Sequence, residues 1–416
     1  MPAIGRQEGT AWSGSGIPHD RVGRVGVKIR YGMVGGGPGA FIGAVHRMAA
    51  ALDGEWELAA GAFSAEATKS AETGRELGLD PARVYASYEG MAEVEAALPA
   101  HERIEAVVIV TPNHLHHPVA RAFLERGFHV VCDKPLTNTI DEAEDLCRLT
   151  AEHGLVFGVT HNYTGYPMVK EARARARGGE LGALRKVVVE YSQGWLRTLL
   201  EAEGQKQAAW RGDPERAGIS SALGDIGSHA HNLVRYVTGL EVVRLMADLG
   251  TVVDGRVLED DATVLLELEG GVRAVLIASQ ISTGERNHLR LRVYGADAAI
   301  DWCQEDPNRL RLVDPSGDER VLYRGSPALS AASTAATRLP GGHPEGFIEA
   351  FANIYRGVAA AVRALGDEGQ PPASPAVLDY PTVQDGARGV HFIHRAVASS
   401  RQGGWVDASY TPPSGS

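Results

Sequence analysis

The sequence of 416 residues predicts an α/β protein in two parts. In the first part, from about residue 28 to 160, short apolar runs alternate with longer segments of helical period. This alternation is typical of βαβ units around a parallel sheet. After about residue 180 the apolar residues instead alternate with period two between glycine-containing turns, which indicates an antiparallel or mixed sheet. The length also favours more than one domain, because it exceeds what one compact core accommodates.

The first part divides into strands and helices that follow one another along the chain. The apolar run IEAVVIV at 104–110 fits a strand buried on both faces. The last helix is expected to begin at a cap formed by Thr139 and Asp141. In chain order we expect strands at 29–34, 56–63, 104–110, 129–134 and 155–160, and helices at 41–52, 66–77, 115–126 and 140–153.

The second part is expected to contain several sheet strands and two closing helices. The sequence LEGGV at 268–272 indicates a hairpin. The segment 325–342 is small, polar and bounded by proline and glycine, so it is expected to be a flexible loop. Sheet strands are expected within 186–195, 262–282 and 288–302, and helices at 344–365 and 382–402.

The overall composition speaks against several classes of protein. A net charge of −11 disfavours a nucleic-acid partner, which needs basic surface. No apolar run reaches the roughly 18 residues of a membrane span. Residues 1–27 lack the apolar segment of a secretion signal and are expected to be a disordered extension or a misassigned start. Cys132, Cys147 and Cys303 are odd in number and lie in apolar runs, which favours neither disulfides nor a metal site. We therefore expect a cytoplasmic protein with no membrane partner and no metal.

The first strand leads into the glycine-rich sequence GGGPGAFIG at 35–43. Gly35, Gly37 and Ala40 match the dinucleotide fingerprint, which needs a tight turn, a close approach of backbone to pyrophosphate, and a small residue between helix and strand. Pro38 suits the first helical turn, where its missing N–H is not needed. The helix N-terminus that follows offers free N–H groups to phosphates. The motif therefore predicts a dinucleotide cofactor.

The end of the second strand bears on the choice between NAD and NADP. An acidic residue there would bind the ribose hydroxyls of NAD, whereas an arginine would favour the phosphate of NADP. The sequence has Phe63-Ser64-Ala65-Glu66, in which Glu66 could reach the ribose and Lys69 is the only nearby cation. We expect NAD, with NADP as the alternative.

Thr111-Pro112-Asn113 follows the buried strand at 104–110. The carboxyl end of such a strand is where ligands meet an open α/β sheet. His114, His116 and His117 come directly behind this motif. Because these positions point in different directions around a helix start and no carboxylate joins them, we expect them to serve helix entry rather than a metal.

Two more motifs carry ionisable side chains. The strand HVVC ends on Asp133-Lys134-Pro135, which by itself suits a solvent-facing strand terminus. In GDIGSHAH (224–231), Asp225 and His229 are four residues apart and share one helical face. A carboxylate so placed can orient an imidazole and tune its pKa for general-base catalysis. Taken alone, such a pair is more often found on a surface.

Together these motifs resemble the Gfo/Idh/MocA family, which includes glucose–fructose oxidoreductase and inositol dehydrogenases. The resemblance covers about residues 28 to 407 and rests on GGGPGAFIG, TPNHLH, CDKPL, WRGDP followed by GDIGSH, and PTVQDGARGVHFIHRAVASSRQGGWV. It implies an N-terminal Rossmann domain at 28–160. A C-terminal α/β domain with a large open, mostly antiparallel sheet would follow at 161–407 and serve substrate binding and oligomerisation, with a flexible tail at 408–416. A homodimer or homotetramer acting on a sugar or cyclitol is also implied.

The resemblance further implies a set of site residues. His229 would take a proton from the substrate hydroxyl, Lys134 would stabilise alkoxide charge, and Asp225 would orient His229. His231 and Gln280 are weaker candidates. The predicted cofactor contacts are Gly35, Gly37, Pro38, Gly39, Ala40, Phe41, Ile42, Ser64, Thr111, Pro112, Asn113, His116, Asp133, Lys134, Asn162, Trp210 and Arg211. The predicted substrate contacts are Lys134, His161, Tyr163, Trp195, Asp225 and His229.

The sequence departs from the family pattern in two places. Asp133 stands where relatives have glutamate, so a contact to the cofactor must come closer or be lost. Ser220-Ser221-Ala222 stands where relatives often have glycines, which affects loop shape and substrate size. A cis Lys134–Pro135 bond is a further hypothesis, since X–Pro bonds tolerate that form. The alternative function is a redox-neutral enzyme that cleaves glycosides through transient oxidation. A non-catalytic nucleotide sensor is disfavoured by the retained Lys134, Asp225 and His229.

Overall fold

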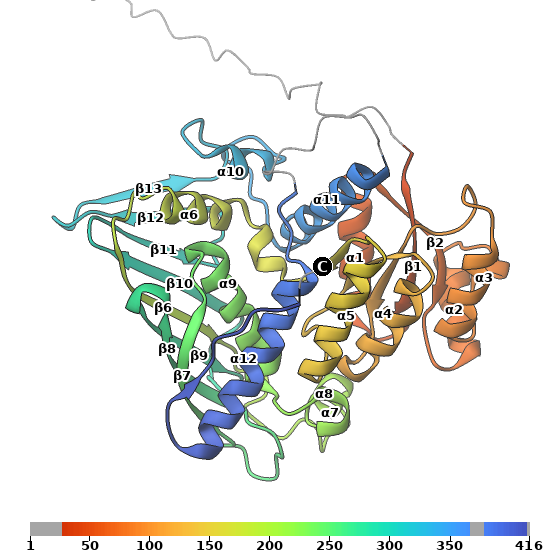
Figure 1. The fold of residues 1–416 in the computed structure, drawn as a ribbon, viewed down its shortest axis with the longest axis horizontal. Helices are drawn as coiled ribbons and strands as arrows, with labels where there is room; N and C mark the ends of the chain where they lie inside the picture. Colours follow the sequence, from red (N-terminus) through yellow and green to blue (C-terminus); the bar gives the residue numbers. More distant parts are fainter. Residues whose placement is uncertain (1–26, 367–377, 414–416) are drawn as a thin grey trace, which may run out of the picture.

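The computed structural model describes residues 27–366 and 378–413, which fold around two sheets (Figure 1). The first sheet has five strands in the order β2-β1-β3-β4-β5, and every pair is parallel. The predicted parallel sheet is therefore confirmed. Its strands are β1 (Ile29–Gly35), β2 (Trp56–Ala62), β3 (Ala106–Val110), β4 (His129–Cys132) and β5 (Phe157–Val159).

Helices connect these strands as the sequence predicts, with one addition. The predicted cap at Thr139 exists as a capping box in which Thr139 and Glu142 exchange bonds with each other's backbone. Helix α3 begins at Ser87, whose side chain accepts a bond from Gly90 N, and the sequence did not predict this helix. The connecting helices are α1 (Phe41–Leu52), α2 (Ala67–Glu76), α3 (Tyr88–Ala97), α4 (His116–Leu124) and α5 (Ile140–Glu152), with 3-10 turns at Pro81–Arg83 and Asn113–Leu115.

Two helices from the end of the chain also pack on the first sheet. Helix α11 (Phe347–Gly366) places Phe351 and Tyr355 in the core formed by α1 and one face of the sheet. Tyr355 is anchored there, because its hydroxyl lies 2.7 Å from His46 Nδ1 and its carbonyl accepts a 3.2 Å bond from Trp56 Nε1. Helix α12 (Val383–Gln402) joins the core on the other face. The first sheet thus depends on segments more than 200 positions away.

The second sheet has nine strands in the order β13-β12-β11-β10-β6-β9-β8-β7-β14. Only β6 and β9 are parallel neighbours, so the predicted open, mostly antiparallel sheet is confirmed. The predicted hairpin joins β8 to β9 through Glu269–Gly271. The strands are β6 (Leu184–Ser192), β7 (Val242–Gly250), β8 (Asp261–Leu268), β9 (Arg273–Ser279), β10 (His288–Gly295), β11 (Ala299–Cys303), β12 (Arg309–Val313), β13 (Glu319–Tyr323) and β14 (Val406–Asp407).

Helices cover one face of this sheet, and shorter helices lie between the two sheets. Helices α6, α9 and α12 pack on the second sheet, with α9 and α12 on its side towards the first sheet, and α7 and α8 lie near α5 of the first domain (Figure 1). The remaining bounds are α6 (Pro167–Arg177), α7 (Lys206–Arg211), α8 (Pro214–Ala217), α9 (Ser228–Thr238) and α10 (Ala331–Ala335), with a 3-10 turn at Asn162–Gly165 and a π-helical turn at Leu223–Gly227.

The segment 325–342 differs from the predicted loop. It contains α10, which Ser330 caps by accepting a bond from Ser333 N. The buried guanidinium of Arg324 pairs with Glu345 at 2.8 Å and donates to Leu339 O at 2.7 Å. Small residues favour a loop, but the three alanines of α10 after a serine cap also favour a helix.

The ends of the chain fall partly outside the described residues. Of the predicted extension at 1–27, the structure describes only residue 27. Of the predicted tail at 408–416, it describes residues 408–413. Within that tail, Ala408 N donates to Val243 O at 2.8 Å and Tyr410 stacks on His391. Among the helices in the described ranges, none has the length and apolar character needed to cross a bilayer.

Candidate active site

A cavity of about 1600 Å³ lies between the carboxyl edge of the first sheet and the second sheet. Its wall combines the turns after β1, β2, β3 and β4 with residues of β6, α7, α9 and the connection between β9 and β10. An open α/β sheet binds ligands at this edge. The motifs singled out in the sequence therefore converge on one space.

The glycine turn after β1 has the geometry of a phosphate-binding turn. Gly35 has φ +85°, and an added Cβ would lie 2.7 Å from Val110 O. At Gly37 an added Cβ would lie 2.7 Å from Phe63 O. Helix α1 then begins at Phe41 with no acidic residue in its first turn, so its N-terminus favours an anion. Pro38, Ala40, Phe41 and Ile42 line the cavity, whereas Gly39 is not part of the wall.

Two buried polar atoms on the wall support the fit of a dinucleotide. Thr111 Oγ1 and Asn162 Nδ2 are buried and have no hydrogen-bond partner within the described part of the chain. Both residues line the cavity. Since buried polar groups are normally paired, such orphan atoms indicate contacts that a ligand supplies. The glycine turn and these two atoms together fit a nicotinamide dinucleotide.

The ribose end of the site contains an ion pair. Ser64, Glu66 and Lys69 all line the cavity beyond β2. Lys69 Nζ lies 2.6 Å from Glu66 Oε1, and both side chains are more than half exposed. The carboxylate and the ammonium therefore offset each other beyond β2, the position expected to distinguish NAD from NADP.

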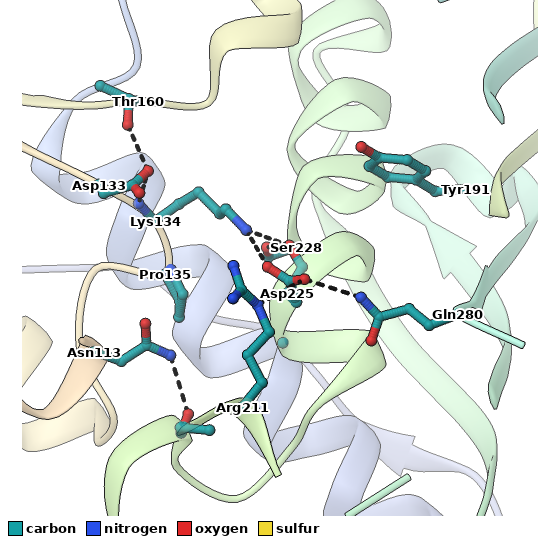
Figure 2. A network of polar contacts seen from close by, with 12 residues as sticks. Asn113, Asp133, Lys134, Pro135, Thr160, Tyr191, Arg211, Asp225, Ser228 and Gln280 are labelled. Carbon is teal, nitrogen blue, oxygen red and sulfur yellow. Dashed lines mark hydrogen bonds and ion pairs between the residues drawn. The ribbon is translucent and has the colours of Figure 1, made fainter. Parts of the chain in front are cut away.

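The turn after β3 contacts the second half of the chain. Pro112 and Asn113 line the cavity, and Asn113 Nδ2 donates to Ala217 O at 3.1 Å (Figure 2). His116 is placed differently from its predicted cofactor contact, because it is buried with its ring nitrogens 2.8 Å from Pro135 O and 3.0 Å from Thr111 O. His116 thereby connects the turn after β3 with the turn after β4, and it lies outside the cavity wall. The neighbouring His117 pairs with Asp145.

The strand end Asp133-Lys134-Pro135 delivers its side chains into the cavity. Asp133 Oδ1 accepts 2.9 Å bonds from the Thr160 hydroxyl and from Lys134 N. The Lys134–Pro135 peptide bond is cis, which confirms that prediction. Lys134 Nζ reaches Asp225, contacting both Oδ1 and the backbone O at 2.6 Å (Figure 2).

Asp225 is the centre of the polar network at the second motif. It lies on the π-helical turn ahead of α9, and its Oδ2 accepts bonds from Gln280 Nε2 at 2.9 Å and Arg211 Nε at 3.2 Å (Figure 2). Burial alone raises the pKa of Asp225, but Arg211 and Lys134 outweigh that effect and hold it well below its usual value. Asp225 is therefore ionised at neutral pH.

His229 lies on the same helix but does not hydrogen-bond Asp225. The predicted orientation of His229 by Asp225 is thus not seen, because Asp225 is engaged by Lys134, Arg211 and Gln280. His229 lines the cavity, and its Nδ1 is buried without a partner in the described structure. Burial, Lys134 and His161 hold the pKa of His229 well below its usual value, although Asp225 opposes them. The imidazole is therefore neutral at neutral pH.

Aromatic and amide side chains form the wall opposite the cofactor turn. Tyr163 and Trp195 line the cavity as predicted for substrate contacts, and so do Trp210 and Arg211. His161 is not on the wall, because it is buried behind His229 with ring centroids 5.5 Å apart. Tyr191, Gln193 and Asn287 also line the cavity but were missed. They lie on β6, directly after it and directly before β10, where period-two patterning gives no sign of a site.

The serines before Asp225 have a partner of their own. The buried Glu259 carboxylate accepts a 2.6 Å bond from the Ser220 hydroxyl and bonds from the backbone N of Ser221 and Leu223. Ser220 Oγ in turn accepts a 2.9 Å bond from Gly224 N. The departure from glycine in this segment therefore fixes the turn that carries Asp225.

Comparison with known families agrees with this geometry. Residues 29–161 match the model of an oxidoreductase family with an NAD-binding Rossmann fold, and residues 169–301 match the GFO/IDH/MocA C-terminal domain. The chain belongs to the Gfo/Idh/MocA oxidoreductase family. Its first domain is the NAD-binding Rossmann domain of that family.

Several Gfo/Idh/MocA proteins are similar along most of their length. An uncharacterized oxidoreductase, YfiI of Bacillus subtilis, is 35% identical over 91% of this chain and 96% of its own. The levoglucosan dehydrogenase of Pseudarthrobacter phenanthrenivorans is 26% identical over 71% of this chain and 80% of its own. The structure of an inositol dehydrogenase homolog from Azotobacter vinelandii, complexed with NAD+, superposes with a TM-score of 0.87 at 38% identity, covering 91% of this chain and 97% of that one.

Proposed function

We propose that this protein is an NAD-dependent dehydrogenase that oxidises a secondary hydroxyl of a sugar or cyclitol. The observation that carries the proposal is the Lys134–Asp225 ion pair beside a neutral His229. These residues line the same cavity as the glycine turn after β1. Relatives named as dehydrogenases of levoglucosan and D-xylose, and a homolog solved with NADH and myo-inositol, support this substrate class.

The proposed roles follow from the protonation states. Bound NAD would accept the hydride, held by the turn at 35–42 with Thr111 and Asn162. His229 is neutral, so it takes the hydroxyl proton as general base. Lys134 donates a hydrogen bond to the developing alkoxide. Asp225 holds Lys134 and Arg211 in place through its two carboxylate oxygens.

The neutral and aromatic wall supports a polyol substrate. Trp195 offers an apolar ring face, and Lys134 and His229 offer polar atoms to hydroxyl groups. Asp225 offsets one of the two positive charges of Lys134 and Arg211. A sugar or cyclitol with several hydroxyls fits these groups.

The proposal is tested by following NADH absorbance across a panel of inositols, aldoses and glycosides with NAD and NADP in parallel. We expect reduction of NAD by at least one polyol and a loss of about 100-fold or more in kcat for Lys134→Ala. Lys28→Ala is the matched control, because Lys28 is exposed ahead of β1 and lies outside the cavity wall. Activity of Lys134→Ala equal to wild type, with no polyol oxidised, would overturn the proposal. Glycoside cleavage without net NADH would instead identify the redox-neutral alternative.

We also propose that the open face of the second sheet joins copies of this chain into a homodimer or homotetramer. Val243, Leu265, Tyr294 and Val321 point away from the covering helices and are more than a third exposed. Multi-angle light scattering of the purified protein tests this assembly, and a monomer at micromolar concentration would contradict it.

A further inference from the structure

Tyr163, Tyr191 and Asn287 contact one another in a closed ring on the cavity wall. The two tyrosine oxygens lie 2.5 Å apart, Tyr191 OH lies 2.7 Å from Asn287 Oδ1, and Asn287 Nδ2 lies 3.2 Å from Tyr163 OH. Both tyrosines are buried. These three residues, here called the tyrosine–asparagine ring, come from the turn after β5, from β6 and from the β9–β10 connection.

The direction of each bond in the ring follows from Trp195. An indole N–H can only donate, so the atom of Gln193 that lies 3.0 Å from Trp195 Nε1 is the carbonyl oxygen. Gln193 therefore turns its amide nitrogen to Asn287 Oδ1 at 2.7 Å. Asn287 must then present its own nitrogen to Tyr163, which fixes an orientation that is otherwise ambiguous for an amide.

The hydroxyl protons of both tyrosines are donated to hydrogen bonds within the tyrosine–asparagine ring. Tyr191 donates to Asn287 Oδ1, so Tyr163 must donate to Tyr191 and accept from Asn287 Nδ2. Neither hydroxyl is then free to donate to a substrate or to exchange a proton. The tyrosine–asparagine ring accordingly has a structural task beside the reacting groups.

That task concerns His229, whose Nδ1 has no hydrogen-bond partner in the described structure. The imidazole is held by ring contacts instead. The Tyr163 ring centroid lies 4.8 Å away at an interplanar angle of 81°, and the Tyr191 centroid lies 6.3 Å away. His161 contacts the same imidazole at 5.5 Å. An aromatic cage, not a hydrogen bond, sets the direction of His229.

We propose that Asn287 is a positioning residue that locks Tyr163 and Tyr191 against His229 and so aims the imidazole at the cavity. The inference rests on the proposed role of His229 as general base. It assigns a function to a residue on the loop before β10 that touches His229 only through the two tyrosines.

Kinetics of Asn287→Ala provide the first test. Loss of the tyrosine–asparagine ring misaligns the base, so we expect kcat to fall about 10- to 100-fold with a KM change of less than about threefold. Tyr191→Phe removes two bonds of the tyrosine–asparagine ring but keeps the aromatic face against His229, so it should show a smaller loss of kcat. Tyr410→Phe is the matched control, because it removes a hydroxyl that bonds Glu144 at 3.2 Å outside the cavity. A rise in KM with unchanged kcat in Asn287→Ala would overturn the inference.

The pH dependence of Asn287→Asp provides the second test. The charged groups that act on His229 are Lys134 and His161, which lower its pKa, and Asp225, which raises it. A new carboxylate in the ring adds to the effect of Asp225. We expect the acidic limb of kcat/KM to move up by about one pH unit. An unshifted limb would contradict a connection between Asn287 and His229.

An observation that does not need turnover separates this inference from the proposed function. The His229 signal of protein labelled with ¹³C at histidine Cε1 is assigned by its absence in His229→Asn and titrated in wild type, Asn287→Ala and Asn287→Asp. A changed chemical shift or titration midpoint in both variants supports the inference even if no polyol is oxidised. An identical His229 titration in all three proteins, each with a wild-type circular dichroism spectrum, would overturn it.

Discussion

Asp225 has a different task from the one its spacing suggests. A carboxylate four residues before an imidazole predicts a direct contact, but the carboxylate oxygens bind Lys134, Arg211 and Gln280 instead. Its effect on His229 is electrostatic. At the residue scale, Asp225 is therefore the anion that keeps two cations ordered in the cavity.

This role predicts the behaviour of Asp225→Asn. The neutral amide leaves Lys134 and Arg211 without a buried counter-charge, so we expect kcat to fall about 100-fold or more. Asp225 also raises the pKa of His229. Its removal lowers that pKa, and the acidic limb of the pH–rate profile should move to lower pH. A limb that moved to higher pH would contradict the electrostatic role.

The ion pair of Glu66 and Lys69 predicts a change in cofactor preference. In Glu66→Ala the ammonium of Lys69 loses its 2.6 Å partner and becomes available to the 2′-phosphate of NADP. We expect the ratio of kcat/KM for NADP over NAD to rise about tenfold. Lys69→Ala should lower the same ratio. Equal ratios in both variants and wild type would show that the pair does not face the ribose.

The sequence predicts the site residues that lie together in short motifs. It does not predict those that come together only when distant strands pair. Lys134, Asp225 and the turn at 35–42 lie in short motifs with recognisable spacing, and all of these residues except Gly39 line the cavity. Tyr191 and Asn287 lie 96 positions apart and meet only because β6 and β10 are paired neighbours. A single sequence carries no signal for that pairing.

At the element scale, the packing of α1 on β1 is set by two glycines. An added Cβ at Gly43 would lie 2.4 Å from Gly36 Cα, a distance that real contacts do not reach. Helix α1 can lie this close to the turn only without a side chain at that position. The elements themselves were largely predictable, since apolar period and glycine turns located all five strands of the first sheet.

Gly43→Ala is therefore expected to push α1 away from the phosphate turn. We expect the dissociation constant of NADH, measured by fluorescence titration, to rise about tenfold or more. Gly389→Ala on α12 is the matched control, because an added Cβ there meets no atom within 4 Å. Unchanged NADH affinity in Gly43→Ala would show that the turn tolerates the displaced helix.

Several elements were not predicted, among them α6, β7 and some that lack a strong pattern. Helix α3 has a short, mixed sequence, and β12 and β13 are brief strands at the edge of the second sheet. Their existence depends on neighbours that offer hydrogen bonds and apolar surface. Tertiary context decides such segments more than propensity does.

At the scale of the whole molecule, buried neutral histidines make stability depend on pH. Burial lowers the pKa of His46 to about 4, and burial together with Arg103 lowers that of His129 to about 4. His129 Nδ1 accepts a 3.0 Å bond from Val156 N, which requires an unprotonated nitrogen. In the unfolded chain both histidines titrate near their ordinary pKa of about 6.5.

The folded protein should therefore lose stability as the pH falls. Between about pH 6.5 and pH 4 the unfolded state binds protons that the folded state does not, so each such histidine lowers the free energy of unfolding by up to about 1.4 kcal/mol per pH unit. Above pH 6.5 the contribution is fully present. Urea denaturation at pH 7 and pH 5 measures the loss, which His129→Gln should reduce. Equal stability at both pH values would contradict this account.

The packing of α11 against the first sheet bears on how the molecule is made in the cell. A nascent chain that stops before residue 347 lacks Phe351 and Tyr355, which complete the core around β1, β2 and α1. One apolar face of the N-terminal sheet is then open to solvent while the second sheet is still leaving the ribosome. The NAD-binding domain thus precedes the second sheet in the chain, yet its core is completed by a helix that follows that sheet.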